Sequence, residues 1–392
     1  MAELKFLSAA EGKSEATCSC PKPTGHRISS GQPEAHQAEV ETVPHWVTGT
    51  IATPAGLVPV VSPALTRADL WRHVRCRVSS FRDAFALRPG LYAVGAPDST
   101  SEVLVSANYR LSFDHLRREL QGMHVWILVL DTKGINVWCA AGKGTFGTDE
   151  LVRRISASHL DRVVEHRRVI VPQLGAPGIA GLRVKRATGF RVQYGPVHAR
   201  DIRPYIEAGC QATPEMRTVG FSLLDRLVLT PMEINPAMKK YFPFYAAVIL
   251  AAFGLQPTGI IFSSALSGSL PFLLLGLLSV VAGAFLTPLL LPLIPLRSFA
   301  VKGWIVGLVS VFVAAQASPL LNPAGAILPV ITYLFFPLAS SYIALQFTGA
   351  TTFTGMSGVR KELRIAIPIY VSSTVISIVL LLVYKLGEWG IL

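Results

Sequence analysis

Charged residues are scarce in the second half of this 392-residue sequence. Residues 243–392 contain six of the 36 Lys and Arg residues and two of the 24 Asp and Glu residues. The first 242 residues therefore hold the other 30 basic and 22 acidic side chains, a net charge of +8. Because a water-exposed surface needs charge, this scarcity argues against a soluble fold for the second half. It predicts a membrane domain over residues 236–392.

Cysteine is also rare, and the spacing of the five cysteines resembles no disulfide framework: Cys18, Cys20, Cys76, Cys139 and Cys210. This pattern excludes a disulfide scaffold and fits a reducing compartment. Cys18 and Cys20 have His26 and His36 nearby, but their spacing matches no standard zinc pattern. A metal site in this segment stays an alternative that the spacing does not favour.

The N-terminus lacks the uninterrupted apolar stretch of a signal peptide, so we expect no secretory leader. Residues 1–44 are rich in Ser, Pro, Gly and Glu and are predicted to form a disordered tail. The basic clusters Arg72–Arg77 and Arg162–Arg168 have no interleaved aromatic residues. This argues against nucleic-acid binding and favours a basic surface near anionic lipid.

The apolar half contains five segments that approach or exceed the roughly 20 residues needed to cross a bilayer: 244–262, 270–294, 303–321, 326–347 and 365–386. The prolines of the second segment predict a kink or an early end. Basic residues precede the first segment and follow the second and the fourth, whereas the loops Ser263–Leu270 and Ser318–Gly325 carry no charge. By the positive-inside rule the protein spans the inner (cytoplasmic) membrane several times, with the soluble half in the cytoplasm and Leu392 outside.

The five segments hold almost no ionisable residue before Lys385. Transport pathways usually need such groups at membrane depth, so anchoring is favoured over transport. The connection Phe347–Glu362 is rich in glycine and hydroxyl groups. It remains open whether it is a flexible linker or a docking surface for the soluble half.

Residues 45–235 alternate between strand-like and helical patterns, which favours an α/β domain with a largely parallel sheet. The strand-like runs are Leu91–Val94, Val103–Ser106, Val125–Asp131, Val169–Val171, Phe190–Tyr194 and Leu223–Leu229. The predicted helices are Phe113–Gln121 capped by Ser112, one capped by Thr148, and Ala199–Ala208. Ligands of such sheets bind at the carboxyl ends of the strands. The segment Thr132–Gly147 is therefore expected near a ligand.

Several chemistries compete for this segment. The glycines from Gly142 to Gly147 satisfy G-x-G-x-x-G, but they start eleven positions after Asp131, too far from the strand for dinucleotide binding. A phosphate-binding P-loop is excluded. With Gly142-Lys143 as its Gly-Lys pair, the motif would need glycine at position 137, which is valine, and Ser or Thr at position 144, which is glycine. Two alternatives stay open for Cys139: a Cys–His pair with His124, His159 or His166, and an inert buried thiol. Lys143 and the small residues around Cys139 argue against the second.

The run Asn136-Val137-Trp138-Cys139-Ala140-Ala141-Gly142-Lys143 resembles the signature of the corrinoid protein of microbial mercury methylation, the HgcA family. The resemblance covers about residues 90–390, including the apolar tail. It extends to further segments at 106–114, 130–135, 144–148, 172–176, 194–197 and 225–231. It implies a Rossmann-like corrinoid-binding α/β domain followed by an all-α membrane domain of about five transmembrane helices.

The resemblance also implies roles for single residues. Cys139 would be the catalytic residue and the lower axial ligand of the corrinoid (cobalamin-type cobamide) cobalt. The other seven residues of the octapeptide would form a cap around it: Asn136, Val137, Trp138, Ala140, Ala141, Gly142 and Lys143. A facing wall would come from Thr132, Gly134, Gln173, Leu174, Gly175, Gly195 and Pro196.

The implied reaction is methyl transfer to Hg(II), giving methylmercury. Mercuric ion is an electrophile, so the methyl group must leave with both electrons, and a thiolate opposite the methyl group would favour this. The chain has no Cys₄ iron–sulfur spacing. The resemblance therefore implies a partner ferredoxin of the HgcB type with two 4Fe–4S clusters, and a folate-linked methyl donor. The alternatives are a corrinoid methyl carrier or sensor serving another acceptor, and a transporter with a regulatory domain.

Overall fold

A computed structural model describes residues 44–323, 325–350 and 356–391 of the chain. The expected disordered tail, including Cys18 and Cys20, lies outside these residues except for Pro44. The described residues form two compact units that divide between Asn235 and Pro236. Each unit is considered by itself.

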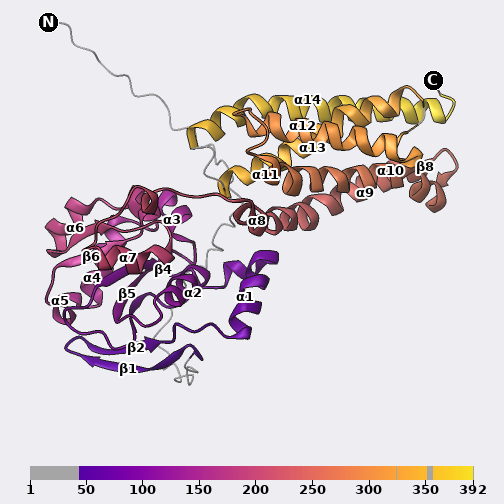
Figure 1. Cartoon of the computed structure of the whole chain (residues 1–392). Coiled ribbons are helices and arrows are strands. Elements are labelled where there is room, and N and C mark those ends of the chain that lie inside the picture. Colours follow the sequence, from indigo (N-terminus) through magenta and orange to yellow (C-terminus); the bar gives the residue numbers. More distant parts are fainter. Residues whose placement is uncertain (1–43, 324, 351–355, 392) are drawn as a thin grey trace, which may run out of the picture. The chain divides into compact units, whose positions relative to one another are not determined.

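The first unit is built on a seven-stranded sheet with the order β1-β2-β3-β5-β4-β6-β7 (Figure 1). The strands are β1 Val47–Thr53, β2 Gly56–Val61, β3 Gly90–Val94, β4 Val103–Ala107, β5 Val125–Leu130, β6 Arg168–Val171 and β7 Arg191–Tyr194. Strands β5, β4, β6 and β7 pair in parallel, whereas β1 with β2 and β3 with β5 are antiparallel. Strands β2 and β3 also pair in parallel, so four of the six neighbouring pairs are parallel and the expectation of a largely parallel sheet holds.

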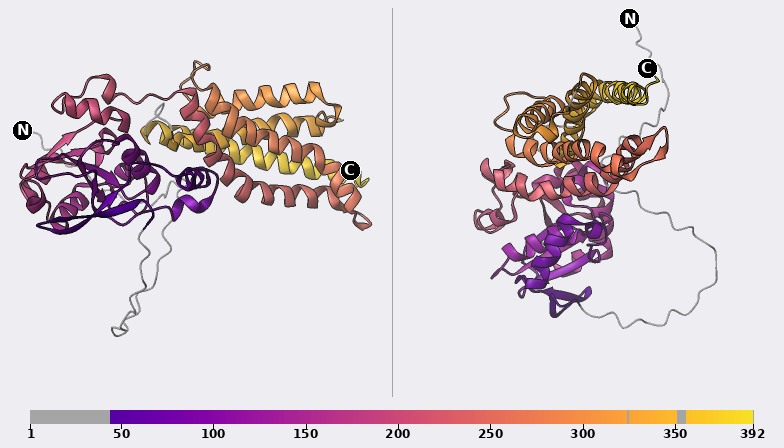
Figure 2. Two further views of the ribbon diagram at one scale, coloured as in Figure 1. Left: turned by 60° about the horizontal axis from the view of Figure 1, so that its bottom comes forward. Right: turned by 90° about the vertical axis from the view of Figure 1, so that its right-hand side faces the viewer.

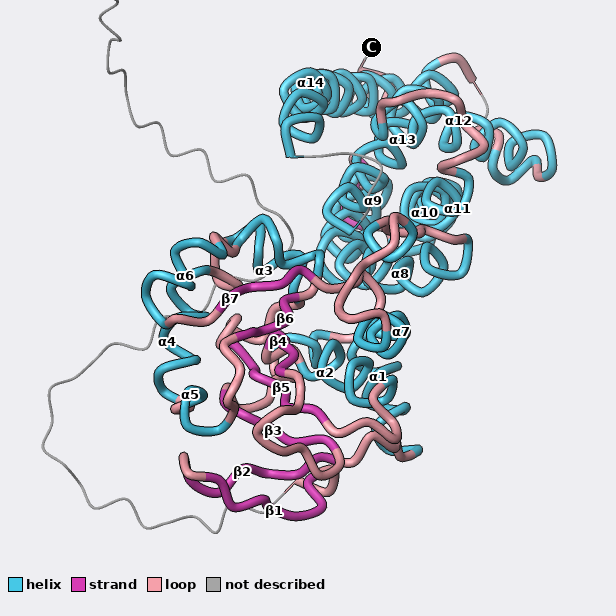
Figure 3. The backbone as a smooth tube through the Cα atoms, turned by 60° about the vertical axis from the view of Figure 1, so that its left-hand side comes forward, coloured by secondary structure: helices cyan, strands magenta, loops and turns pink. Residues whose placement is uncertain are grey.

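Helices cover both faces of this sheet (Figure 3). They are α1 Arg67–Val78, α2 Arg110–Glu119, α3 Val137–Lys143, α4 Thr148–Ala157, α5 Leu160–Val163, α6 Gly181–Thr188 and α7 Ile202–Glu207. One apolar core joins the sheet to α4, α5 and α6, and a second core on the other face joins it to α2 and α7. Because both faces are covered, every residue of β4 and β5 is buried, which explains their uninterrupted apolar runs.

Three local predictions were wrong. Residues Leu223–Leu229 form the start of helix α8, Leu223–Pro236, and not a strand. Helix α2 begins at Arg110, so Ser112 lies inside it and does not cap it. Gly147 holds the cap position of α4, and the Thr148 hydroxyl instead accepts a hydrogen bond from the Ala180 amide at 2.8 Å. The β1–β2 hairpin and α1 were not predicted, although Thr66 and Asp69 form a capping box at the start of α1.

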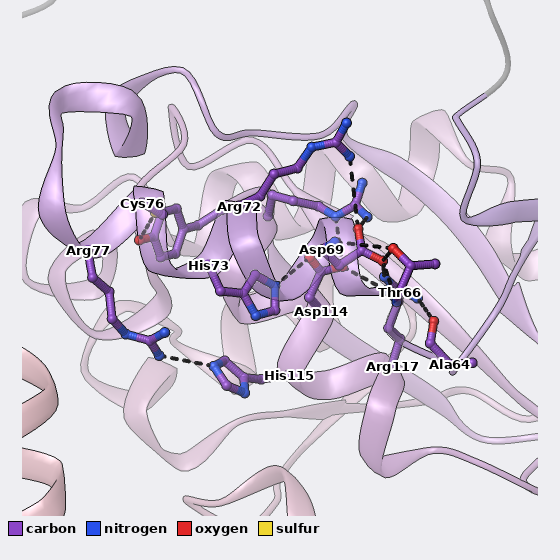
Figure 4. Close-up of polar contacts among 12 residues, drawn as sticks. Ala64, Thr66, Asp69, Arg72, His73, Cys76, Arg77, Asp114, His115 and Arg117 are labelled. Carbon is purple, nitrogen blue, oxygen red and sulfur yellow. Dashed lines mark hydrogen bonds and ion pairs between the residues drawn. The ribbon is translucent and has the colours of Figure 1, made fainter.

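A buried network of charges joins α1 to α2 (Figure 4). Arg117 is fully buried and donates to Asp114 at 2.7 Å and to Asp69 at 3.2 Å, while His73 lies 2.9 Å from Asp114. Burial opposes ionisation of Asp69, but hydrogen bonds from Thr66 and the charge of Arg117 outweigh it and lower the pKa to about 2. Both carboxylates are therefore ionised and paired at neutral pH.

The second unit is helical: α9 Phe242–Gly254, α10 Phe262–Val281, α11 Thr287–Leu290, α12 Phe299–Ala317, α13 Ile327–Gln346 and α14 Met356–Glu388. The long helices run side by side (Figure 2). Among the described residues, four stretches are long and apolar enough to cross a membrane: Phe262–Leu290, Phe299–Ala317, Ile327–Gln346 and Gly358–Glu388. The second expected segment ends early, as its prolines predicted.

The expected span 244–262 is not among these four stretches. The helix here is not short: α8, the π-helical turn Ala237–Tyr241 and α9 follow one another without a break from Leu223 to Gly254. Lys239 and Lys240 limit its apolar part. It ends before a small hairpin, β8 Leu255–Gln256 and β9 Gly259–Ile260, where Gly259 adopts a φ of +121°. Pro257 and Gly259 break the helix here, and the apolar sequence alone did not reveal that break.

Helix α12 packs closely on α13 because its small residues leave room for the neighbouring backbone. A Cβ atom on Gly303 would lie 2.5 Å from the Ala344 Cβ, and one on Gly307 would lie 2.6 Å from the Ser340 Cβ. The same helix begins at Phe299, four residues earlier than expected, and so includes Lys302. Lys302 is buried and donates to the Leu291 carbonyl at 2.6 Å. The observed helix therefore contains an ionisable group that lies just outside the expected segment 303–321.

Candidate functional site

The loop after β5 is shaped by Asn108, which follows the neighbouring strand β4. Its side-chain oxygen accepts hydrogen bonds from the Thr132 amide (3.0 Å), the Thr132 hydroxyl (2.8 Å) and the Gly134 amide (3.0 Å). Gly134 has a φ of +69°, which glycine adopts without strain. Asn108 is buried, and so is Thr132. Thr132 and Gly134, expected in the facing wall, therefore fix the course of the loop that leads into α3.

Helix α3 comprises the last seven residues of the octapeptide, and its two ends are well defined. The Asn136 side chain caps its first turn by accepting a hydrogen bond from the Cys139 amide at 2.9 Å. At the other end Gly144 adopts the left-handed conformation, with a φ of +80°. The capping residues thus set the position of Cys139 within the first turn.

One side of α3 packs into the domain. Ala140 and Ala141 are buried and contact the 3₁₀ segment Gln173–Gly178. A Cβ atom on Gly178 would lie 3.3 Å from the Ala141 Cα and closer still to the Phe146 carbonyl, so only glycine permits this approach. Gly175 is likewise buried against the Phe146 ring. Gly175, expected in the facing wall, allows this close packing.

The opposite side of α3 is open. Cys139 is partly exposed, and Gly142 follows it by three residues and so lies one turn further along the same face. A Cβ atom on Gly142 would meet nothing within 4 Å. Lys143 is exposed, and Trp138 is 38% exposed. This face presents a thiol beside a bare stretch of backbone, an arrangement that admits a broad, flat ligand.

The other two described cysteines lie in different surroundings. Cys76 is 1% exposed, with its sulfur 3.1 Å from the Tyr109 hydroxyl. Cys210 packs against the second core, and burial together with the charge of Glu102 raises the pKa of its thiol. Neither thiol lies on an open helix face as Cys139 does.

A cavity of about 630 Å³ adjoins the start of α3 at the carboxyl ends of β4 and β6 and beyond the end of β7. It brings together six predicted site residues: Asn136, Val137, Trp138, Leu174, Gly195 and Pro196. The other nine predicted residues do not line it: Cys139, Ala140, Ala141, Gly142, Lys143, Thr132, Gly134, Gln173 and Gly175. The cavity lies where ligands of α/β sheets bind, within the range of small-molecule pocket volumes.

The remaining wall of this cavity carries charged side chains, which the sequence did not predict. It is lined by the arginines Arg77, Arg118 and Arg200, by His115 and His198, and by the acids Glu119 and Asp225. Burial and the charge of Arg77 lower the pKa of His115 to about 4, so this imidazole is neutral near pH 7. Hydrogen bonds from Ser222 hold the pKa of the Asp225 carboxyl below its usual value. Of these arginines, Arg77 alone belongs to one of the basic clusters of the sequence, so those clusters did not indicate this wall.

The Gln173 side-chain oxygen is buried and has no hydrogen-bond partner among the described residues. It belongs to the same 3₁₀ segment as Leu174, which lines the cavity. Buried acceptors without a partner are unfavourable by about 1–3 kcal/mol. Gln173 is therefore a candidate to accept a hydrogen bond from a ligand.

Comparison with known proteins relates this domain to proteins of one-carbon chemistry. Residues 79–205 match the family described as the CO dehydrogenase/acetyl-CoA synthase delta subunit, CdhD. The matched region includes α3 and most of the cavity wall. It covers less than half of the chain, so it relates the α/β domain alone to this family.

Several curated proteins are similar to parts of the chain. The acetyl-CoA decarbonylase/synthase complex subunit gamma of Methanopyrus kandleri is 30% identical over 135 residues, 34% of this chain and 29% of that protein. The corrinoid/iron-sulfur protein large subunit of Moorella thermoacetica is 28% identical over 120 residues, 30% of this chain and 26% of that protein. The chain thus spans less than a third of the length of these relatives.

Proposed function

We propose that the protein is a membrane-anchored, corrinoid-dependent methyltransferase with Cys139 as the axial ligand of the corrinoid cobalt. The observation that carries the proposal is the open face of α3, where a partly exposed thiol stands one turn before Gly142. Similarity to a corrinoid/iron-sulfur protein supports the class of cofactor. The octapeptide around Cys139 supports the finer proposal that Hg(II) is the methyl acceptor.

The residues present fit a corrinoid. A thiolate is a suitable donor for cobalt, and the space beside Gly142 lets a macrocycle approach the backbone. The unpartnered oxygen of Gln173 suits the amide groups that surround a corrin ring. The caps at Asn136 and Gly144 hold the helix so that the sulfur position is fixed before the cofactor binds.

The bound corrinoid would supply a methyl group, which must leave with both electrons of its bond to cobalt because Hg(II) is an electrophile. The Cys139 thiolate would hold the cobalt and donate electron density to it, which would favour this mode of transfer. Lys143, on the same face one turn further on, stabilises the thiolate form. Trp138 and Val137 line the adjoining cavity and exclude water from the side of the site near α3.

We also propose that α9, which continues the helix from α8, and the four long apolar helices span a membrane with the basic loops on the cytoplasmic side. Lys239 and Lys240 precede α9, Arg297 precedes α12, and Arg360 and Lys361 lie at the start of α14. The turns around 255–261 and 318–326 carry no charge. This alternation follows the positive-inside rule and anchors the methyltransferase domain at the inner membrane surface.

Because the sequence has no Cys₄ cluster motif, the electrons that regenerate the cofactor must come from a partner. We propose a ferredoxin with two 4Fe–4S clusters for this role, and a folate-linked donor for the methyl group. The Moorella relative is named a corrinoid/iron-sulfur protein, which agrees with a pairing of corrinoid and iron–sulfur chemistry.

The Cys139→Ala variant tests the proposal, with Cys210→Ala as the matched control for loss of a thiol. Each variant is expressed with the ferredoxin partner in an anaerobic host that is supplied with Hg(II). We expect Cys139→Ala to lose methylmercury formation and Cys210→Ala to retain it. Full activity of Cys139→Ala refutes the assigned role.

A second candidate is a corrinoid methyl carrier or sensor that serves another acceptor, and the similarity to acetyl-CoA decarbonylase/synthase subunits favours it. The two functions differ in the acceptor and share the cofactor. Purified protein loaded with a labelled methyl group distinguishes them when incubated with and without Hg(II). Label released as methylmercury supports the first function, and label retained in the presence of Hg(II) supports the second.

A further inference from the structure

The helical unit contains a cavity of about 1120 Å³ between the start of α12, the start of α14 and the middle of α13. It exists because α14 packs on α13 and contacts α12 little. In the apolar window of α14, 17% of the residues are buried, against 39–44% in the other three long helices. The cavity therefore opens toward the surroundings of the bundle along α14.

The end of this cavity near the basic loops carries positive charge. Arg297 and Lys361 are exposed and line it. Glu362 also lines it, but its carboxylate accepts hydrogen bonds from the Ser298 hydroxyl and the Ala300 amide, both at 3.0 Å. Glu362 thereby caps α12 and is engaged with that helix. Arg297 and Lys361 are left available for an anionic ligand.

The rest of the cavity is apolar. Trp304, Ile365 and Ile369 line it and are 39%, 59% and 49% exposed, respectively. At its inner end the Tyr370 and Ser341 hydroxyls are hydrogen-bonded to each other at 2.7 Å. A ligand that matches both parts must combine an anionic group with a long apolar chain.

We propose that this cavity binds an anionic phospholipid of the cytoplasmic leaflet. Its phosphate would contact Arg297 and Lys361, and one acyl chain would lie along Trp304, Ile365 and Ile369. Basic pockets between membrane helices on the cytoplasmic side recognise anionic headgroups in this way. The inference requires the proposed membrane insertion of the helices and is independent of the corrinoid.

The test uses the full-length protein in nanodiscs and the fluorescence of Trp304. Lipids with brominated acyl chains quench nearby tryptophan, and the difference between wild type and Trp304→Phe isolates the signal of this residue. At equal content, brominated phosphatidylglycerol is expected to quench Trp304 more than brominated phosphatidylcholine does. Equal quenching by the two lipids overturns the proposal.

The variant R297Q/K361Q removes both cations, and K239Q/K240Q removes the same charge from the same end of the unit outside the cavity. Each basic side chain near a membrane is worth roughly fivefold in affinity, so the first variant should lower the preference for phosphatidylglycerol about 25-fold. The control should keep it. An equal loss in both variants indicates general surface charge and contradicts a defined site.

Two further measurements distinguish the lipid site from a site for a free anion and from a failure of membrane insertion. Inorganic phosphate at constant ionic strength should leave the quenching unchanged, and displacement of the lipid by phosphate means that the site takes a free anion. Alkaline carbonate extraction reports membrane insertion by itself. Extraction of the protein into the soluble fraction refutes insertion and the lipid site together, whereas an inserted protein without selective quenching refutes the lipid site alone.

Discussion

The substitution Gly142→Ala separates the stability of α3 from its ability to admit a ligand. Gly142 lies inside the helix, and a Cβ atom there would meet nothing within 4 Å. Replacing a helical glycine with alanine stabilises a helix by roughly 0.5–1 kcal/mol. The variant should therefore fold at least as well as the wild type. If a macrocycle approaches the open face of α3, however, the new methyl group would stand in its way.

The size of the effect on binding follows from the cost of overpacking one methyl group, about 1–3 kcal/mol. A tenfold change in affinity corresponds to about 1.4 kcal/mol, so corrinoid affinity should fall between roughly fivefold and 150-fold. Titration of the purified apoprotein with cobamide, followed by absorbance, measures this change. Thermal unfolding of the same samples measures stability.

Gly387→Ala is the matched control, because Gly387 is also helical and a methyl group added there would also meet nothing within 4 Å. It should bind corrinoid as the wild type does. Unchanged corrinoid affinity in Gly142→Ala would refute the inference that the ligand lies over this face of α3. If the Gly142→Ala apoprotein fails to fold, the space beside Gly142 is not open.

Three further predictions follow from the packing. Asn108→Ala removes the acceptor for the Thr132 and Gly134 amides. It should lower the free energy of unfolding, measured by urea titration, by about 1–3 kcal/mol and should weaken corrinoid binding. Equal corrinoid binding by the variant and the wild type would contradict the role of this loop. Asp69 has a pKa of about 2 in the folded domain, below its unfolded value near 3.8, so its contribution to stability is present above pH 4 and lost as the pH falls toward 2. Acid unfolding followed by circular dichroism should show a smaller loss over this range in Asp69→Asn, and an identical loss would count against the network. Gly307→Ile should separate α12 from α13 and reduce thermal stability in detergent, because even one added Cβ would lie 2.6 Å from the Ser340 side chain. An unchanged melting temperature would disprove this packing.

The sequence predicted the sheet well where burial is complete. Strands β3 to β7 follow apolar runs bounded by polar or glycine residues, and the structure confirms all five. It failed at Leu223–Leu229, because a short apolar run is compatible with either a strand or one side of a helix. The hairpin of β1 and β2 was missed because the exposed residues of both strands weaken their apolar pattern.

Parts of the candidate site were accessible to sequence reasoning and parts were not. The position of α3 after β5 follows from local order along the chain, so residues 136–143 were placed correctly beyond that strand. The meeting of Arg77, Arg118 and Arg200 at one cavity depends on how α1, α2 and the segment after β7 pack. Local patterns do not contain that information. Likewise, the sequence did not indicate that Gly175 packs closely against the Phe146 ring.

The most direct test of the account is cobalt X-ray absorption of the purified, corrinoid-loaded protein. Wild type should show one sulfur neighbour of the cobalt, and that neighbour should be absent in Cys139→Ala while Cys210→Ala retains it. A spectrum of the wild-type protein with nitrogen or oxygen in place of sulfur would contradict the assignment of Cys139. So would a sulfur neighbour that persists in Cys139→Ala.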